Sequence, residues 1–133
     1  MNEASKPDNH RDRLARARSN LLLAESGRQQ GVFLEDLCFE AQQSAEKALK
    51  AVSVFCKVEF PKTHSLTTLA GLLEQAGIPL PTEVRDADLL TSYAVQARYP
   101  DWDEAVTEPE YQRALALARQ VVIWAEKVIR EKK

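Results

Sequence analysis

Apolar residues recur at intervals of three and four along most of the chain, which is the spacing of helices that bury one face. Five segments follow this pattern, residues 8–28, 32–56, 64–75, 82–97 and 108–130. Breaks rich in glycine or proline separate several of them, such as the AGIPLP run between the third and fourth segments. No segment alternates apolar and polar residues as a half-buried strand does. The pattern therefore predicts an all-α bundle of about five helices.

Two of the predicted helices begin with residues suited to capping a first turn. Thr63 precedes the third segment, where its hydroxyl can accept a hydrogen bond from a free backbone N–H. Thr107 and Glu110 form a capping box at the start of the last segment, with Pro109 in the first turn. These caps favour helix starts close to the predicted positions.

The last segment carries a second set of large apolar residues beside its core stripe. The core stripe consists of Tyr111, Leu115, Ala118, Val122, Ala125 and Ile129, and the flanking set consists of Leu117, Trp124 and Val128. The flanking residues either widen the buried face or meet another subunit, because tryptophan is enriched at interfaces.

The second segment has two distinct faces. Its apolar residues fall on one side, as expected for a helix buried in a bundle: Leu34, Leu37, Ala41, Ala45, Ala48, Val52 and Phe55. The opposite face carries Gln43, Lys47 and Lys50 beside Phe39 and Val54. Gln43 and Lys47 are four residues apart and therefore neighbours on the helix surface, and Lys50 follows three residues later.

This polar face has three possible interpretations. Two ammonium groups and an amide on adjacent turns could bind a phosphate or a carboxylate. The face could also be an ordinary solvated surface, because Glu46 can pair with Lys50 at the i,i+4 spacing. In the third interpretation it is a dimer seam, in which Phe39 and Val54 pack across a two-fold axis.

Three residues outside this face are also candidates for binding or chemistry. His64 opens the third segment, where it could contact a phosphate, act as an acid or base, or serve as a structural histidine. Arg98 ends the fourth segment and could hold a phosphate, pair with Asp101 or cap the helix. Tyr99 could stack on a base or fill the end of the bundle.

Composition narrows the classes of protein. The 133 residues fit one domain over the whole chain, with residues 1–7 as a loose N-terminus. The net charge of -2 excludes holding duplex nucleic acid by bulk charge but allows a short RNA or a nucleotide at a local patch. The chain shows no signal peptide, no apolar run that spans a membrane and no metal-binding motif.

The two cysteines add to this picture. Cys38 and Cys56 should lie roughly 27 Å apart on one helix, too far for a disulfide, and both fall on an apolar side. Inert core thiols of this kind fit a reducing compartment, so we expect a cytoplasmic protein.

Three sequence elements together resemble the HEPN domain family, the higher-eukaryote and prokaryote nucleotide-binding domain. They are FEAQQSAEKALKA at 39–51, THSL at 63–66 and RYP at 98–100. The resemblance implies a four- to five-helix up-and-down bundle that is commonly a homodimer. It also implies nucleotide binding as a proposed role, and for many members a neighbouring minimal nucleotidyltransferase, some pairs acting as toxin and antitoxin. The residues at the family's recurring positions are then a ligand or partner surface: Lys47, Lys50, His64, Arg98 and Tyr99.

The chain departs from the ribonuclease branches of that family. Those branches use an arginine, four to six arbitrary residues and then a histidine. For His64 the arginine would stand at position 57, 58 or 59, but these hold Lys57, Val58 and Glu59. His10 has no arginine at position 3, 4 or 5, and Arg98 is followed by no histidine. Ribonuclease chemistry by that route therefore cannot be carried over.

Three hypotheses follow. The leading one is a non-catalytic module without a cofactor that binds a nucleotide, or docks a nucleotidyltransferase, through the region of Lys47, Lys50 and Arg98. The second is an RNA-cleaving toxin with a different site, in which His64 is the acid or base and Arg98 stabilises the phosphate. The third is a purely structural homodimerisation domain.

Overall fold

Every regular element in the described part of the chain is a helix. The computed structural model describes residues 9–94 and 105–131. The elements are α1 (His10–Ser26), α2 (Leu34–Phe55), α3 (Leu66–Gln75), α4 (Thr82–Arg85), the 3-10 helix η2 (Asp86–Ala94) and α5 (Glu108–Glu131). The predicted all-α fold is confirmed.

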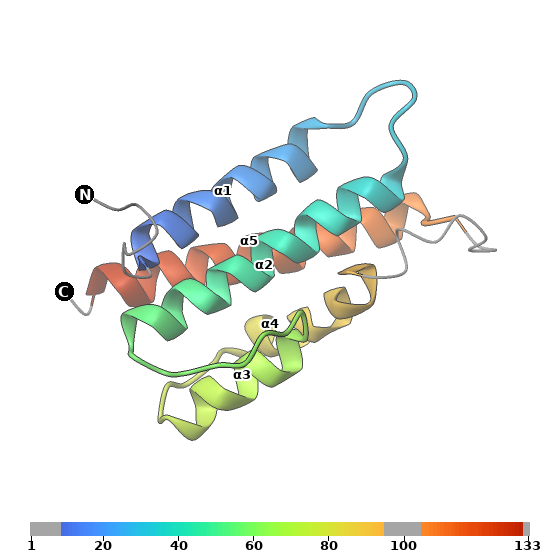
Figure 1. Cartoon of the computed structure of the whole chain (residues 1–133). Helices are drawn as coiled ribbons and strands as arrows, with labels where there is room; N and C mark the ends of the chain where they lie inside the picture. The colour runs from blue at the N-terminus through green and yellow to red at the C-terminus, as the bar shows by residue number, and fades with distance from the viewer. Residues whose placement is uncertain (1–8, 95–104, 132–133) are drawn as a thin grey trace.

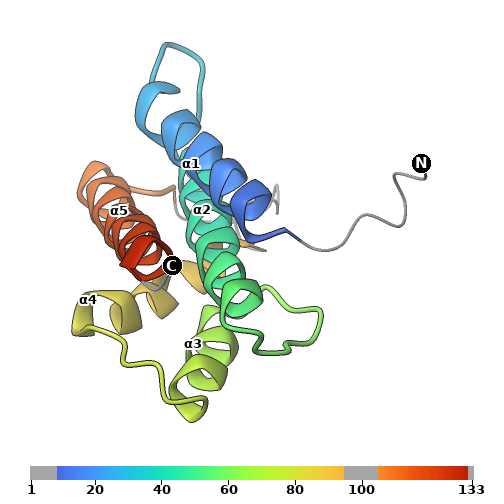
Figure 2. The same ribbon diagram turned by 90° about the vertical axis from the view of Figure 1, so that its left-hand side faces the viewer.

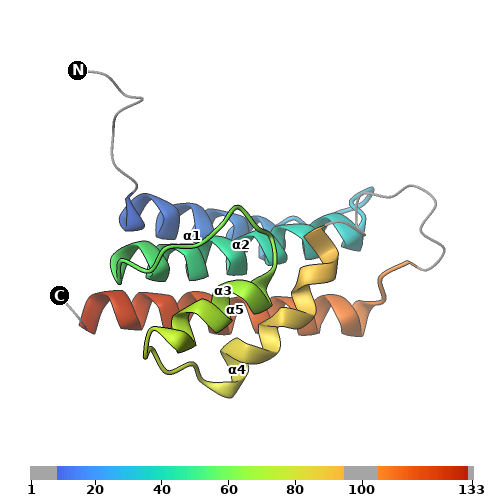
Figure 3. The same ribbon diagram turned by 60° about the horizontal axis from the view of Figure 1, so that its bottom comes forward.

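Three long helices run side by side, and the short helices cover one side of them. Helix α1 runs antiparallel to both α2 and α5 (Figure 1). Helix α2 contacts α1, α5, η2 and α3, so it is the central element. Figure 3 shows α3, α4 and η2 crossing in front of the α2–α5 pair. The bundle therefore surrounds α2 on most sides.

Small residues explain how α2 can occupy the centre. Ala41, Ala45 and Ala48 are fully or almost fully buried, and their short side chains allow neighbouring helices to approach closely. Tyr111 is buried on α5, and its hydroxyl donates to the carbonyl oxygen of Ala24 on α1 at 2.6 Å. The core of the bundle therefore joins α1, α2 and α5 directly.

Local chemistry sets the two ends of α1. The side chain of Asn9 accepts from the backbone N–H of Arg11 at 2.8 Å and of Asp12 at 3.3 Å, so the helix begins at His10 rather than at residue 8. At the other end, a Cβ on Gly27 would lie 2.7 Å from the carbonyl oxygen of Leu23. Only glycine fits this turn without a shift of the backbone.

The predicted start of α3 is wrong by two residues. Ser65 is the N-cap, and its hydroxyl accepts from the backbone N–H of Thr68 at 3.1 Å. Thr63 instead accepts from the backbone N–H of Ser65 at 3.0 Å, which shapes the turn before the cap. His64 consequently lies in the loop, not in the helix.

The predicted α-helix over 82–97 is also wrong, because most of this segment forms a 3-10 helix. Only four residues form α-helix, and the chain continues as the 3-10 helix η2. A 3-10 helix has three residues per turn, so side chains three apart lie above one another. The inward-facing residues Val84, Ala87, Leu90 and Tyr93 follow this spacing of three. Residues 95–97 lie outside the described residues.

The predictions for α5 are confirmed. Thr107 and Glu110 form the capping box, with Glu110 Oε1 2.9 Å from the backbone nitrogen of Thr107 and the return bond at 3.3 Å. Trp124 is buried, and Leu117 and Val128 pack against the core. The flank therefore widens the buried face. No helix in the described ranges is long and apolar enough to cross a membrane.

Candidate functional site

The predicted polar face of α2 is half-buried and tied to other side chains. Lys47 Nζ donates to Asn20 Oδ1 on α1 at 2.8 Å, and Asn20 Nδ2 in turn donates to Glu40 Oε1 at 2.6 Å. Gln43 Nε2 donates to Gln42 Oε1 at 2.8 Å. Lys47 therefore joins two helices, and its ammonium group is already engaged.

Glu46 is the centre of a second and more buried network. Its residue is only 4% exposed, and its carboxylate accepts from Gln42 Nε2 at 3.0 Å and from Lys50 Nζ at 2.9 Å. The ring nitrogen Nδ1 of His64 lies 2.9 Å from Glu46 Oε1. The Glu46–Lys50 pair expected at the i,i+4 spacing does form. The interpretation as a solvated surface pair is wrong, because both side chains are largely covered.

These hydrogen bonds keep Glu46 ionised. Burial alone would raise the pKa of its carboxyl group, but the bonds from Lys50, Gln42 and His64 outweigh burial and lower the pKa below the usual glutamate range. The carboxylate therefore stays charged at neutral pH and holds its three donors in place. From the sequence, Glu46 is predicted only as a partner of Lys50. Its i,i+4 spacing to both Gln42 and Lys50 was the signal for a larger network.

His64 lies on the outside of this network. Its side chain is 70% exposed, while its carbonyl oxygen accepts from Gln42 Nε2 at 3.3 Å. The prediction that His64 stands at the open N-terminus of a helix is wrong. Two of the first amides of α3 already have partners, because the N–H of Leu66 donates to Thr91 Oγ1 at 3.1 Å and that of Thr68 donates to Ser65 Oγ at 3.1 Å. His64 can still present its ring to solvent.

A cationic groove lies next to this network, beyond the end of α2. Two cations lie close to the ring of Phe60, with Arg13 Cζ 5.5 Å and Lys50 Nζ 5.7 Å from its centroid. The adjoining open groove has a volume of about 520 Å³. Its lining residues come from α1, from the end of α2 and from the following loop: Arg13, Ser53, Val54, Lys57, Val58, Glu59 and Phe60.

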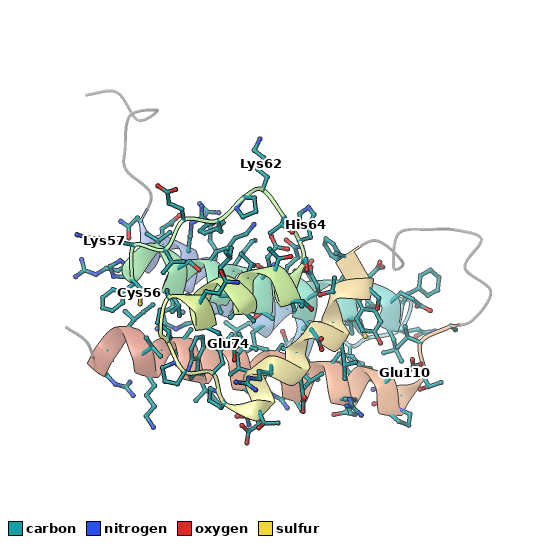
Figure 4. All side chains as sticks on the ribbon, turned by 90° about the horizontal axis from the view of Figure 1, so that it is seen from below. Cys56, Lys57, Lys62, His64, Glu74 and Glu110 are labelled. Carbon is teal, nitrogen blue, oxygen red and sulfur yellow. The ribbon has the colours of Figure 1, made fainter. Side chains whose placement is uncertain are left out.

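Lys57 has an unusual backbone conformation. Its φ of 60° lies in the left-handed region, which favours glycine. The N–H of Val58 donates to Ser53 at 2.8 Å and that of Lys57 to Val54 at 3.1 Å, so the turn closes α2. Figure 4 shows Lys57 at this end of α2, with Lys62 and His64 along the loop that leads to α3. The turn directs the chain past the groove.

The structure brings together only part of the predicted site. Lys50 and His64 meet at Glu46, whereas Gln43 and Lys47 are bonded to Gln42 and Asn20. Arg98 and Tyr99 lie outside the described residues.

None of the residues that line the groove was predicted as a site residue, although Val54 was placed on the polar face of α2. Their closeness depends on how α1 and the loop after α2 pack. No local spacing in the sequence reveals this packing, so the groove becomes visible only in the folded chain.

The cysteines offer no reactive centre in the core. Cys38 is buried, and its burial raises the pKa of the thiol to about 12, so it stays protonated at neutral pH. Cys56 follows the last residue of α2 and is only half-buried, so the prediction of a core thiol holds for Cys38 alone. In the described part of the chain, no three histidine, cysteine or acidic side chains are grouped to hold a metal ion.

Comparisons with known proteins agree on one family. The model of the HEPN domain matches residues 10–128. The crystal structure of TT1696 from Thermus thermophilus is similar, with a TM-score of 0.72 and 31% identity over 90% of this chain and 97% of that one. The archaeal HEPN homologue ST0689 shares the fold, with a TM-score of 0.72 and 24% identity over 92% of this chain and 99% of that one. No curated protein matches the chain. The chain belongs to the HEPN domain family.

Proposed function

We propose that the protein is a non-catalytic binding module that holds the phosphate of a nucleotide or of a short RNA in the groove beside Phe60. The observation that carries this proposal is the Phe60 ring with Arg13 Cζ 5.5 Å and Lys50 Nζ 5.7 Å from its centroid, at the edge of an open groove. An aromatic face next to cations is the combination that binds single-stranded nucleic acid, because the base stacks while the cations neutralise phosphate.

The groove residues have distinct roles in this proposal. The guanidinium of Arg13 and the ammonium of Lys57 would bind the phosphate oxygens, and Phe60 would stack on the base. Lys50 contributes less charge, because the buried carboxylate of Glu46 already neutralises it. Glu59 also lines the groove and would repel a phosphate placed beside it. We place the phosphate beside Arg13 and Lys57, because both line the groove whereas Lys50 does not.

Several earlier expectations remain predictions beside this proposal. Lys47 is better explained as a bridge between α1 and α2 than as a ligand contact. Ligand binding by Arg98 and Tyr99 stays a prediction. A nucleotidyltransferase partner, a toxin–antitoxin pairing, a homodimer and a cytoplasmic location follow from the resemblance or the composition and await their own tests.

Calorimetric titration with ATP, GTP and a short RNA tests the proposal. We expect saturable binding to the wild type. The affinity of Arg13→Ala/Lys57→Ala should be lower by roughly 10-fold or more for each charged contact removed. The matched control is Arg113→Ala/Lys127→Ala, which removes two exposed cations from α5 and should bind as the wild type does. Equal affinity in a folded groove variant, or no binding of any of the three, would contradict the proposal.

One observation favours a second candidate function, acid–base chemistry at His64. The buried carboxylate of Glu46 lies 2.9 Å from Nδ1 of His64 and can accept a hydrogen bond from it, while the side chain of His64 is largely exposed. A carboxylate that orients a histidine in this way is typical of a general base. The base could take the proton of an RNA 2′-hydroxyl, whose oxygen then attacks the adjacent phosphorus as the 5′ oxygen leaves.

Cleavage of a labelled RNA separates the two functions. If His64 is the base, His64→Ala abolishes cleavage, and Glu46→Gln reduces it and shifts its pH dependence. Full cleavage by a folded His64→Ala protein would reject the catalytic function. Binding without any cleavage by the wild type would leave the binding module as the function.

A further inference from the structure

A second surface lies away from the Phe60 groove, between α1 and α5. The two helices lie side by side on one edge of the bundle, while the loop after α2 lies on the other side of α2 (Figure 2). An apolar groove of about 350 Å³ runs between them. Leu22 and Ile123 lie in it and are 62% and 57% exposed, which is unusual for two neighbouring large apolar side chains.

Charged pairs close both ends of this groove. Arg18 on α1 pairs with Glu126 on α5, and Arg119 on α5 pairs with Glu25 on α1. Each helix therefore carries an arginine at one end of the patch and a glutamate at the other. We define the α1–α5 patch as these four charged residues with Leu21, Leu22, Val122 and Ile123.

The patch has an internal two-fold symmetry that is visible in the sequence. Residues 18–25 read RSNLLLAE and residues 119–126 read RQVVIWAE. Both octets start with arginine, place two apolar residues at the fourth and fifth positions and end with alanine and glutamate. Because α1 and α5 run antiparallel, the two octets are related by a half-turn about an axis perpendicular to the patch.

This arrangement makes the patch complementary to itself. The four charged corners alternate in sign around the patch. Two copies can be placed with their patches face to face by rotating one copy by 180° about an axis that lies in the plane of the patch. Whether this axis runs along the helices or across them, every arginine of one copy then faces a glutamate of the other. Leu22 and Ile123 then meet apolar residues of the second copy. A two-fold interface requires one surface that matches itself in this way.

We infer that the α1–α5 patch is the surface through which two copies of this chain associate. Leu22 and Ile123 form its apolar centre, and each end joins two arginine–glutamate pairs into a four-charge network. A dimer seam on α2, the third interpretation of its polar face, is a weaker candidate. Phe39 and Val54 are both half-buried there, whereas Leu22 and Ile123 of the α1–α5 patch are exposed. The assignment gives the expected homodimer a surface and does not rest on phosphate binding at Phe60.

Sedimentation or light scattering of the full chain over a range of concentrations tests the inference. We expect a dimer whose dissociation constant rises about 10-fold or more in Leu22→Glu/Ile123→Glu, because a charge in the centre of an interface is left unpaired. The matched control is Leu89→Glu, a similarly exposed leucine on η2, which should dimerise as the wild type does. A wild type that stays monomeric, or an unchanged dimer in the double variant, would overturn the assignment.

A charge exchange gives a sharper test. Arg18→Glu/Arg119→Glu leaves four carboxylates at the corners, and Glu25→Arg/Glu126→Arg leaves four guanidinium groups. Each folded variant should be monomeric alone. An equimolar mixture of the two variants should form the heterodimer. This heterodimer should disappear when Leu22→Ser/Ile123→Ser is added to the acidic variant. Self-association of either variant at wild-type strength would overturn the inference. Nucleotide titration of the same variants keeps the two proposals separate, since binding at Phe60 should be unaffected.

Discussion

Glu46 is a buried carboxylate within a run of small residues, and it joins Gln42, Lys50 and His64. Burial raises the pKa of its carboxyl group, but the hydrogen bonds from these three residues lower it by more, so the pKa is lowered overall. Glu46 therefore holds the loop before α3 against α2, next to the proposed binding groove.

Glu46→Gln should destabilise the fold by about 3 kcal/mol at pH 7, because it leaves the ammonium of Lys50 covered but without its charged partner. The pKa of Glu46 is lowered in the folded state. The stability that its carboxylate contributes is therefore fully present above the unfolded pKa of about 4.3, and it is lost as the pH falls through the folded pKa. Urea unfolding at several pH values should therefore show the gap between wild type and variant narrowing below about pH 4. Glu83→Gln on exposed α4 is the control, and a gap that stays constant with pH would argue against this role.

Lys57 gives a second prediction at this scale. Its left-handed conformation is one that glycine adopts without strain, so Lys57→Gly should stabilise the protein by about 1 kcal/mol. The same change removes a cation from the groove and should weaken phosphate binding. Thermal unfolding and a nucleotide titration on one sample measure both effects. Lys62→Gly in the same loop should give no gain in stability, and a loss of stability in Lys57→Gly would contradict the strain.

The helical elements could be predicted from sequence wherever one period dominated. The stripes of α2 and α5 and the capping box of Thr107 are local features, and all three are found in the structure. The start of α3 could not be predicted, because Thr63 and Ser65 are both good caps and tertiary bonds to Gln42 and Thr91 decide between them. The 3-10 helix was missed because spacings of three and of three to four look alike over so few turns.

Two glycines give opposite predictions at the scale of the elements. Gly27→Ala should destabilise the protein by about 1–3 kcal/mol, because the new Cβ would lie 2.7 Å from a backbone oxygen of α1 and 2.8 Å from Leu37. Gly71→Ala should stabilise it by about 0.5–1 kcal/mol, because the position is inside α3 and nothing lies within 4 Å of the new Cβ. Chemical denaturation of both variants measures the difference, and equal effects would contradict the packing at the end of α1.

At the scale of the whole molecule, α2 separates two surfaces with different chemistry. One side presents the cationic groove of Arg13, Lys57 and Phe60, and the other presents the α1–α5 patch. Two copies joined through the patch would leave the Phe60 groove of each copy open, so ligand binding and self-association are compatible. The overall net charge of -2 hides this division, because it averages over both surfaces. Sequence composition could exclude bulk attraction to duplex nucleic acid but could not place a local cationic site.

The most direct measurement of the central claim is an NMR titration of the isotope-labelled full chain with ATP, read as shifts of assigned backbone amides. The account predicts that the largest shifts cluster at the end of α2 and in the following loop, around Ser53, Lys57 and Phe60, and that they disappear in Arg13→Ala/Lys57→Ala. Shifts gathered on another surface, or no shifts at saturating nucleotide, would contradict the binding module proposed for this groove.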